Sequence, residues 1–154
     1  SSKDKLYNAV LETVTQPLLE ASRPIEELSD PVEALSQYIQ TKLIISRDHP
    51  HASKVFANEV MSGAKVLPKE IGDELYKQSQ MILDKFSTWS AQDLMDDVPA
   101  HHLMFTIWAA TQTYADFGWQ ICSVMQKEQL DDKDYEDAAE FITQLVIKGC
   151  GVKS

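Results

Sequence analysis

The stretch LSDPVEALSQYIQTKLIISRD, residues 28–48, decides the fold class because it combines a helix start with a long helical repeat. Asp30 followed by Pro31 is the usual pair of N-cap and first helical residue. Apolar side chains then recur three or four residues apart, at Val32, Leu35, Ile39 and Leu43. The stretch therefore predicts an amphipathic helix that buries one face.

Similar helix start signals and apolar repeats occur on both sides of this stretch. Ser2 is a candidate N-cap for the first helix, in which Leu6, Val10, Val14 and Leu18 form one stripe. Pro17 is expected to bend that helix or to end its first part. The pattern predicts helices at 3–21, 51–64, 69–90, about 99–127 and about 134–148.

Glycines are expected to limit three of these helices. Gly63 can terminate the helix at 51–64, and Gly149 stops the last one. Gly118 is the one weak point in the helix predicted from 99 to 127. Strand patterns are almost absent, and no repeat or linker divides the 154 residues. We predict an all-α, single helical domain of about six helices.

Composition and charge exclude several classes of protein. Fourteen basic and twenty-four acidic residues give a net charge of -10, so this chain by itself should repel nucleic acid. It carries no transmembrane stretch, and its charged first residues do not resemble a secretory signal, so we expect no membrane partner and a cytoplasmic location. The two cysteines predict neither a disulfide framework nor a zinc site.

The sequence offers no catalytic set and no cofactor motif. Glycine-rich phosphate loops, paired CxxC and HExxH are missing, so we expect no enzyme and no cofactor. His49 and His51 flank a helix start, while His101 and His102 point about 100° apart, which is poor geometry for sharing one metal. We interpret these histidines as surface or capping residues and expect no metal.

The stretch TIWAATQTYADFGW, residues 106–119, contains the candidate ligand site. Trp108 and Gln112 lie four residues apart, on the same side of the predicted helix. An indole wall beside a carboxamide could stack on and hydrogen-bond a small planar heterocycle. Alternatively, the tryptophan fills core volume and the glutamine satisfies a backbone group. Candidates for the opposite wall are Phe56, Asn58, Glu59 and Met61.

The last two predicted helices carry more apolar positions than a peripheral pair needs. We predict that they pair with the same helices of a second chain to form a symmetric four-helix bundle. Packing within one chain explains the pattern equally well. The candidate interface residues are Phe105, Ala109, Cys122 and Met125, followed by Ala138, Ile142, Leu145 and Val146.

The order of several blocks resembles the C-terminal effector domain of TetR-family transcriptional regulators, in particular the RutR-like subgroup. The blocks are SKDKLYNAVLE near the start, YIQTKLIISRDHPHASKVFANEVMSGAKVL, HHLMFTIWAATQTYADF and the final amphipathic helix. SRDHPHAS (46–53) and IWAATQTYADF (107–117) are the most specific of them. The resemblance covers essentially the whole chain.

The resemblance implies a homodimer that senses a small-molecule effector. It also implies that DNA is bound only through an N-terminal helix-turn-helix module absent from this chain, residues 1–154 being the effector-binding and dimerisation domain. In the RutR-like subgroup the effector is a pyrimidine, uracil or thymine, and Trp108 and Gln112 match the pocket residues of its WxxxQ element. The first helix would couple effector binding to the module. The alternative is a helical protein-interaction or scaffold domain with no ligand.

Overall fold

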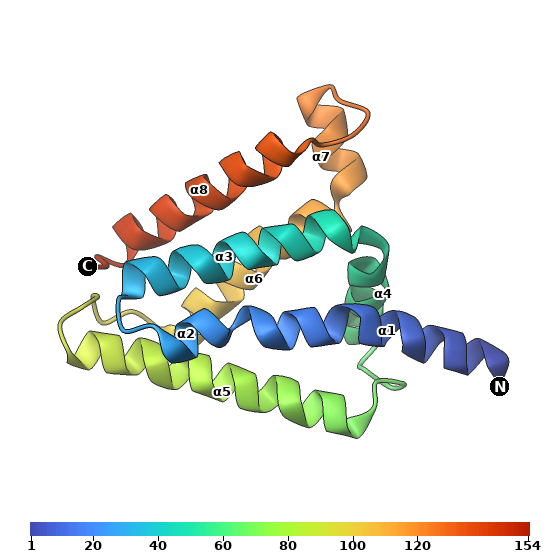
Figure 1. Cartoon of the computed structure of the whole chain (residues 1–154), viewed down its shortest axis with the longest axis horizontal. Helices are drawn as coiled ribbons and strands as arrows, with labels where there is room; N and C mark the ends of the chain where they lie inside the picture. The colour runs from blue at the N-terminus through green and yellow to red at the C-terminus, as the bar shows by residue number, and fades with distance from the viewer.

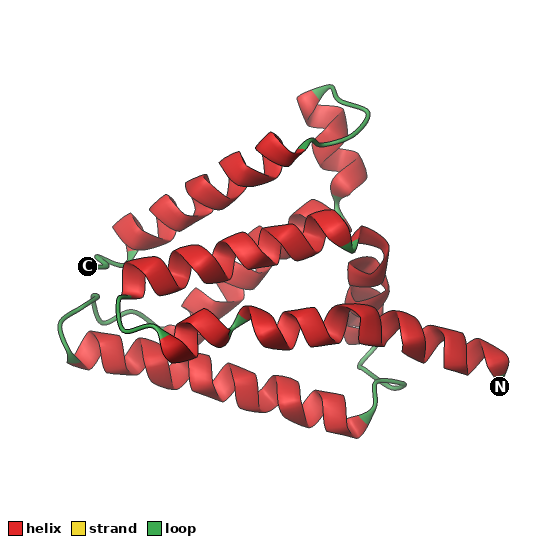
Figure 2. Cartoon of the chain, in the orientation of Figure 1, coloured by secondary structure: helices red, strands yellow, loops and turns green.

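The computed structural model describes residues 1–154, and all its regular structure is helical (Figure 2). Eight helices follow one another: α1 (Ser2–Ala21), α2 (Arg23–Glu27), α3 (Pro31–Asp48), α4 (Pro50–Met61), α5 (Lys69–Ala91), α6 (Ala100–Asp116), α7 (Gly118–Met125) and α8 (Asp132–Gly149). The all-α prediction is confirmed. None of these helices combines the length and apolarity needed to cross a lipid bilayer.

Helix α3 lies at the centre of the molecule, as its apolar repeat predicts. It contacts α1, α2, α4, α6 and α8, and Figure 1 shows α8 on one side of it and α1 on the other. Leu35 and Ile39 are fully buried. The Asp30 carboxylate accepts hydrogen bonds from the backbone N–H groups of Val32 and Glu33, both at 3.4 Å, which fixes the helix start.

Two differences from the predicted helices raise the number from about six to eight. The five-residue α2 was not predicted, because a segment this short carries less than two turns of periodicity. The helix predicted over 99–127 is also wrong, since it breaks at Phe117 and continues as α7 in another direction (Figure 1). Gly118 is the first residue of α7, and a glycine disfavours an uninterrupted helix.

The first helix, α1, differs from its prediction in two ways: it begins one residue earlier, and one residue of its predicted apolar stripe is not buried. Its N-cap is Ser1, not Ser2, and the helix runs through Pro17 without ending there. Val14 and Leu18 are buried, but Leu6 is 68% exposed. The reason is visible in Figure 1, where the N-terminal end of α1 extends beyond the helices that cover the rest of it.

Candidate functional site: a cavity between helices and an exposed helix pair

A cavity of about 700 Å³ lies between α1, α3, α4, α5 and α6. Its volume is within the range of about 300–1,000 Å³ found for small-molecule sites. Of the residues predicted to bind a ligand, the structure brings together in its wall Trp108, Gln112, Phe56, Asn58 and Met61. Packing of α4 against α6 places residues 50 positions apart in one wall.

The indole of Trp108 is held in place by the protein. It is half-buried, and its Nε1 donates a hydrogen bond of 3.3 Å to the hydroxyl of Tyr38 on α3. The ring of Phe105 lies 5.7 Å away, centroid to centroid. Burial raises the pKa of Tyr38 to about 12, so its hydroxyl stays protonated at neutral pH. The N–H group of the indole is therefore occupied by Tyr38, while the rest of the side chain lines the cavity.

The carboxamide of Gln112 is free. This half-buried side chain makes no hydrogen bond with the rest of the protein, although it lines the cavity one turn beyond Trp108. The alternative in which Gln112 satisfies a neighbouring backbone group is not what the structure shows. By contrast, the Gln78 amide on α5 donates to the carbonyls of Leu18 and Leu19 at 2.7 and 2.8 Å. Gln112 thus offers donors and an acceptor that the fold does not use.

Glu59 is the one predicted ligand-binding residue that does not line the cavity. Its carboxylate accepts hydrogen bonds from the N–H groups of Val66 and Leu67, both at 2.8 Å, and from the Tyr7 hydroxyl at 3.1 Å. Burial by itself raises the pKa of Glu59, but these hydrogen bonds outweigh it and hold the pKa below its usual value. Glu59 joins α4 to α1 and to the loop that follows α4.

Three charged side chains also line the cavity, Lys42, Lys54 and Asp116, and the sequence had not singled them out as site residues. Lys42 on α3 is only 5% exposed, and burial lowers its pKa to about 8 against the attraction of Asp116. Asp116, the last residue of α6, has its Oδ1 buried without a hydrogen-bond partner. Burial raises the pKa of Asp116, opposed by Lys54 and Lys42. No ion pair forms between Asp116 and either lysine.

A signal for Lys42 and one for Asp116 were present in the sequence. Lys42 lies three residues after Ile39, on the apolar side of α3, where a lysine is unusual. Asp116 continues the four-residue spacing of Trp108 and Gln112, so the three side chains follow one face of α6. Periodicity alone does not reveal that these two faces border a cavity, because that depends on how α3 and α6 pack.

A second feature lies outside the cavity, on the helix pair α7 and α8. Large apolar side chains there remain in contact with solvent: Trp119 is 83% exposed, Val124 78%, Phe141 67% and Leu145 58%. No residue of α7 is buried. Figure 1 shows α7 and the start of α8 at the edge of the molecule, away from α1 and α5.

The predicted interface residues divide between exposed positions, two of them on α6 and the others on α7 and α8, and the interior. Those accessible to a second chain are Phe105, Ala109, Met125 and Leu145, with Cys122 partly exposed. Ala138, Ile142 and Val146 instead belong to the hydrophobic core of the chain itself, since α8 packs them toward α3. The apolar repeat of α8 is wide enough to serve both faces, so the sequence did not separate them. Phe141 and Trp119, which were not among the predicted interface residues, are instead exposed on α8 and α7.

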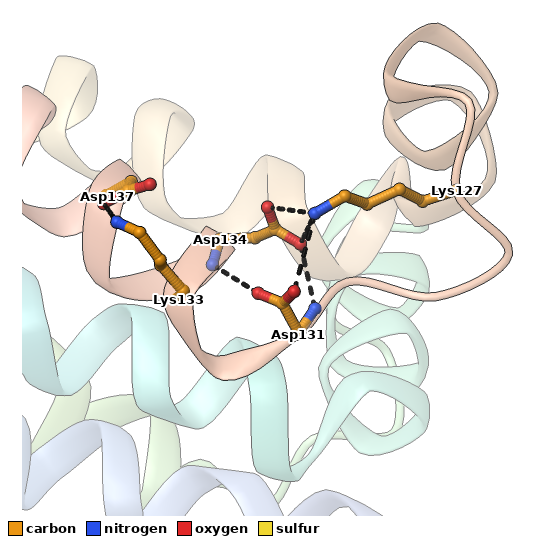
Figure 3. A network of polar contacts seen from close by, with 5 residues as sticks. All are labelled: Lys127, Asp131, Lys133, Asp134 and Asp137. Carbon is orange, nitrogen blue, oxygen red and sulfur yellow. Dashed lines mark hydrogen bonds and ion pairs between the residues drawn. The ribbon is translucent and has the colours of Figure 1, made fainter.

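Polar contacts fix the connection between α7 and α8 (Figure 3). Lys127 Nζ lies 2.7 Å from each carboxylate oxygen of Asp134 and 3.6 Å from Asp131. Asp131 and Asp134 also cap the start of α8 reciprocally. The hydrogen bond from Lys127 holds the pKa of Asp134 below its usual range. A separate pair, Lys133 and Asp137, follows at 2.8 Å.

The histidines take no part in the cavity. His101 and His102 are exposed at the start of α6, each beside the ring of Phe105, at 6.3 and 6.2 Å. No three His, Cys, Asp or Glu side chains gather closely enough to hold a metal ion. Cys122 and Cys150 are free thiols, and burial raises the pKa of Cys150.

The amino-acid sequence of this helical chain matches a known protein family. Residues 11–153 match the TetR C-terminal family described as "YcdC-like protein, C-terminal region". The chain therefore belongs to the TetR family of transcriptional regulators, and this region corresponds to their C-terminal domain.

Particular relatives are transcriptional regulators named RutR. The chain is 32% identical over 152 residues to "HTH-type transcriptional regulator RutR" of Escherichia coli K12. The alignment covers 96% of this chain and 70% of that protein. The protein of the same name from Shigella flexneri matches with the same identity and coverage. These relatives are regulators of transcription, not enzymes.

Proposed function

We propose that this chain is the effector-sensing and dimerisation domain of a TetR-family regulator, and that it controls DNA binding by a helix-turn-helix module outside residues 1–154. The observation that carries the proposal is the cavity of about 700 Å³, in which apolar walls surround the unused carboxamide of Gln112. Apolar walls with a few unpaired polar groups are typical of small-molecule sites. Such a regulator works in the cytoplasm, where its DNA lies.

The effector we propose is a small planar molecule of the uracil or thymine type. The Trp108 indole supplies a flat apolar surface, and Gln112, one helical turn away, supplies hydrogen bonds in both directions. The similarity to RutR supports the same chemistry, because a pyrimidine effector is what resemblance to that subgroup implies. Phe56 and Met61 of α4 would close the opposite side.

The homodimer is proposed to form through α7 and the exposed face of α8. Trp119, Phe141 and Leu145 are more than half exposed, which is unusual for such large apolar side chains. Two copies related by a two-fold axis would cover these residues and build a four-helix arrangement from the two helix pairs. The salt-bridged connection at Lys127 holds α7 and α8 in one orientation for that contact.

Coupling to the DNA-binding module is proposed to pass through α1. Glu59 ties α4, which lines the cavity, to Tyr7 in the N-terminal half of α1. Gln78, which also lines the cavity, bonds the last carbonyls of α1. An effector that favours one position of α4 and α5 would therefore shift α1, and a coupling of about 1–3 kcal/mol would change operator affinity roughly 5- to 150-fold.

Thermal unfolding with and without uracil or thymine tests the sensing function. At about 100 times its dissociation constant, an effector should stabilise the chain by about 2.7 kcal/mol. In a chain that also carries the helix-turn-helix module, operator affinity should differ with and without the effector. Equal affinity in the two conditions would refute the regulatory role.

The second candidate function is a protein-interaction domain without a small-molecule ligand. The uncovered apolar face of α7 and α8 favours it, because a different protein could cover that face as well as a second copy could. The thermal unfolding experiment separates the two functions, because a domain without a ligand should show no stabilisation by nucleobases. Light scattering at micromolar concentration tests the homodimer: the mass of a dimer supports it, and a monomer removes it.

A further inference from the structure

The cavity contains one positive and one negative side chain for which the fold provides no partner. Lys42 is 5% exposed and makes no hydrogen bond or ion pair. Asp116 lines the same cavity, with Oδ1 buried and unpaired. Buried charges in folded proteins are normally paired or fully hydrogen-bonded, because removing them from water is costly. Neither charge contributes to the helix contacts described above.

Pairing of the two charges with each other does not explain them. Lys42 projects from α3 and Asp116 from the end of α6, and no ion pair joins them although each influences the other electrostatically. Both side chains line the cavity, so a ligand in it is positioned to contact both.

We propose that Lys42 and Asp116 are the specificity-determining residues of the cavity, and that they select a neutral effector with an acceptor oxygen and an N–H donor on one small ring. The ammonium of Lys42 would donate to the oxygen, and the carboxylate of Asp116 would accept from the N–H. Cyclic amides and ureides have this arrangement. The inference rests on the proposed sensing function and defines the chemical class that it accepts.

Neutrality of the effector follows from the balance of charge inside the cavity. An anion attracted to Lys42 would be repelled by Asp116, and a cation attracted to Asp116 would be repelled by Lys42. Lys54, an exposed side chain that also borders the cavity, attracts Asp116 as well. A neutral molecule with both kinds of hydrogen-bonding group satisfies Lys42 and the unpaired Oδ1 of Asp116 at once.

The arrangement on α6 agrees with this class of ligand. Trp108, Gln112 and Asp116 follow one face at intervals of about 6 Å, so indole, carboxamide and carboxylate succeed one another along the helix. A flat ring on the indole would have the amide beside it. Its donor edge would point toward the carboxylate and its acceptor edge toward α3.

Calorimetric titration of the whole chain with three related probes tests the proposal. Uracil carries acceptor oxygens and N–H donors, 1,3-dimethyluracil lacks the donors, and orotate adds a negative carboxylate to the same ring. The wild-type chain should bind uracil at least tenfold more tightly than either of the others.

Two variants then separate the roles of the charges. Lys42→Met should weaken uracil binding at least tenfold. Asp116→Asn, which is nearly isosteric, should also weaken uracil at least tenfold but improve orotate relative to uracil, because it removes the repulsion. Lys77→Met and Asp84→Asn are matched controls at exposed positions of α5 and should leave binding unchanged.

The outcomes distinguish this inference from the proposed function. If uracil binds and neither Lys42→Met nor Asp116→Asn changes its affinity, the proposed specificity role of the two charges is wrong, whereas the proposed sensing function is still supported. If orotate binds the wild-type chain more tightly than uracil does, neutral selection is overturned while sensing again stands. If the wild-type chain binds none of the probes, the pyrimidine-sensing function fails and this inference fails with it. Melting curves of each variant establish that it is folded.

Discussion

The cavity and the α7–α8 surface both hold side chains that the fold leaves unsatisfied, but the side chains are of different kinds. The cavity lies between five helices, opens to solvent, and contains unpaired polar and charged groups, among them Gln112, Lys42 and Asp116. The α7–α8 surface is exposed and apolar, with Trp119 and Phe141 as its largest members. A concave space with unused hydrogen-bonding groups suits a small molecule, whereas an open apolar surface suits another protein.

The two regions also differ in the kind of interaction that would contribute binding free energy. Filling the cavity would satisfy a few directed hydrogen bonds, each contributing about 0.5–3 kcal/mol depending on charge. Covering the outer surface would bury large apolar side chains, each contributing about 1.5–3 kcal/mol when fully buried. Variants in one region should therefore leave the property of the other region largely intact.

The largest effect is expected from charging the outer surface. Replacing Phe141 and Leu145 together by glutamate should raise the dimer dissociation constant at least ~1,000-fold, about 4 kcal/mol, because buried carboxylates would face each other across the two-fold axis. Light scattering over a concentration series measures this. Gln144→Glu adds one charge at an exposed polar position of α8 and serves as the control. A dimer that persists in the double variant would mean that the interface lies elsewhere.

Lys42→Met should stabilise the effector-free chain by about 1–3 kcal/mol at pH 7, because it removes a buried ammonium without a partner. The pKa of Lys42 in the folded chain is about 8, below its ordinary 10.5. The unfolded chain therefore binds more protons between these pH values, so the stability contributed by this group rises with pH there. Denaturant unfolding should show this rise in the wild type and not in the variant. Equal or lower stability of Lys42→Met at pH 7 would contradict the cost assigned to the charge.

Trp108→Ala should abolish the stabilisation by uracil or thymine, about 2.7 kcal/mol at 100 times the dissociation constant, since the wall on which the ring stacks is removed. The dimer mass should not change. Tyr76→Ala, at a 65% exposed aromatic residue of α5, controls for loss of an aromatic ring. Thermal shift with the same ligands gives the measurement. A full shift in the Trp108 variant would place the ligand outside this cavity.

Gln112→Ala should weaken binding of the same ligands by about 1 kcal/mol, roughly fivefold in affinity. The effect is smaller than that of Trp108→Ala because neutral hydrogen bonds contribute less than stacking on the indole wall. Calorimetric titration gives the change, with the exposed Gln80→Ala as the matched variant. An unchanged affinity would show that the carboxamide does not contact the ligand.

The smallest effect is expected at the link between α1 and α4. Tyr7→Phe removes the 3.1 Å hydrogen bond to Glu59 and should cost about 0.5–1.5 kcal/mol of stability. Effector affinity should stay within about twofold. In a chain that also carries the DNA-binding module, the response of operator affinity to the effector should be smaller. Tyr76→Phe is the control, and an undiminished response would exclude this link as the route of coupling.

Much of the fold could be predicted because helix boundaries depend on nearby residues. Asp30 and Pro31 start α3 through contacts within one turn, so the sequence shows them directly. Gly63, with φ of 89°, similarly lies just beyond the end of α4. Trp108 and Gln112 were predicted from helix periodicity, and residues of α4 were named as candidates for the opposite wall; all of these but Glu59 line the cavity.

What the sequence could not determine was which of two possible faces each helix buries. The apolar repeat of α8 contains both Ile142, which is buried against α3, and Phe141, which is exposed. The break at Phe117 likewise depends on a modest local preference at Gly118, and it decides that α7 leaves the body.

The sequence by itself determined an all-helical chain with a tryptophan, a glutamine and an aspartate spaced along one helix face, because spacing within a helix follows from its local geometry. Only the tertiary structure decided that Lys42 and Asp116 border the same cavity without forming an ion pair, and that Glu59 instead bonds Tyr7 and the loop after α4. The physical reason is that burial and charge pairing depend on side chains brought together from helices distant in sequence. The local sequence pattern of one helix does not show which side chains of another helix will lie beside it.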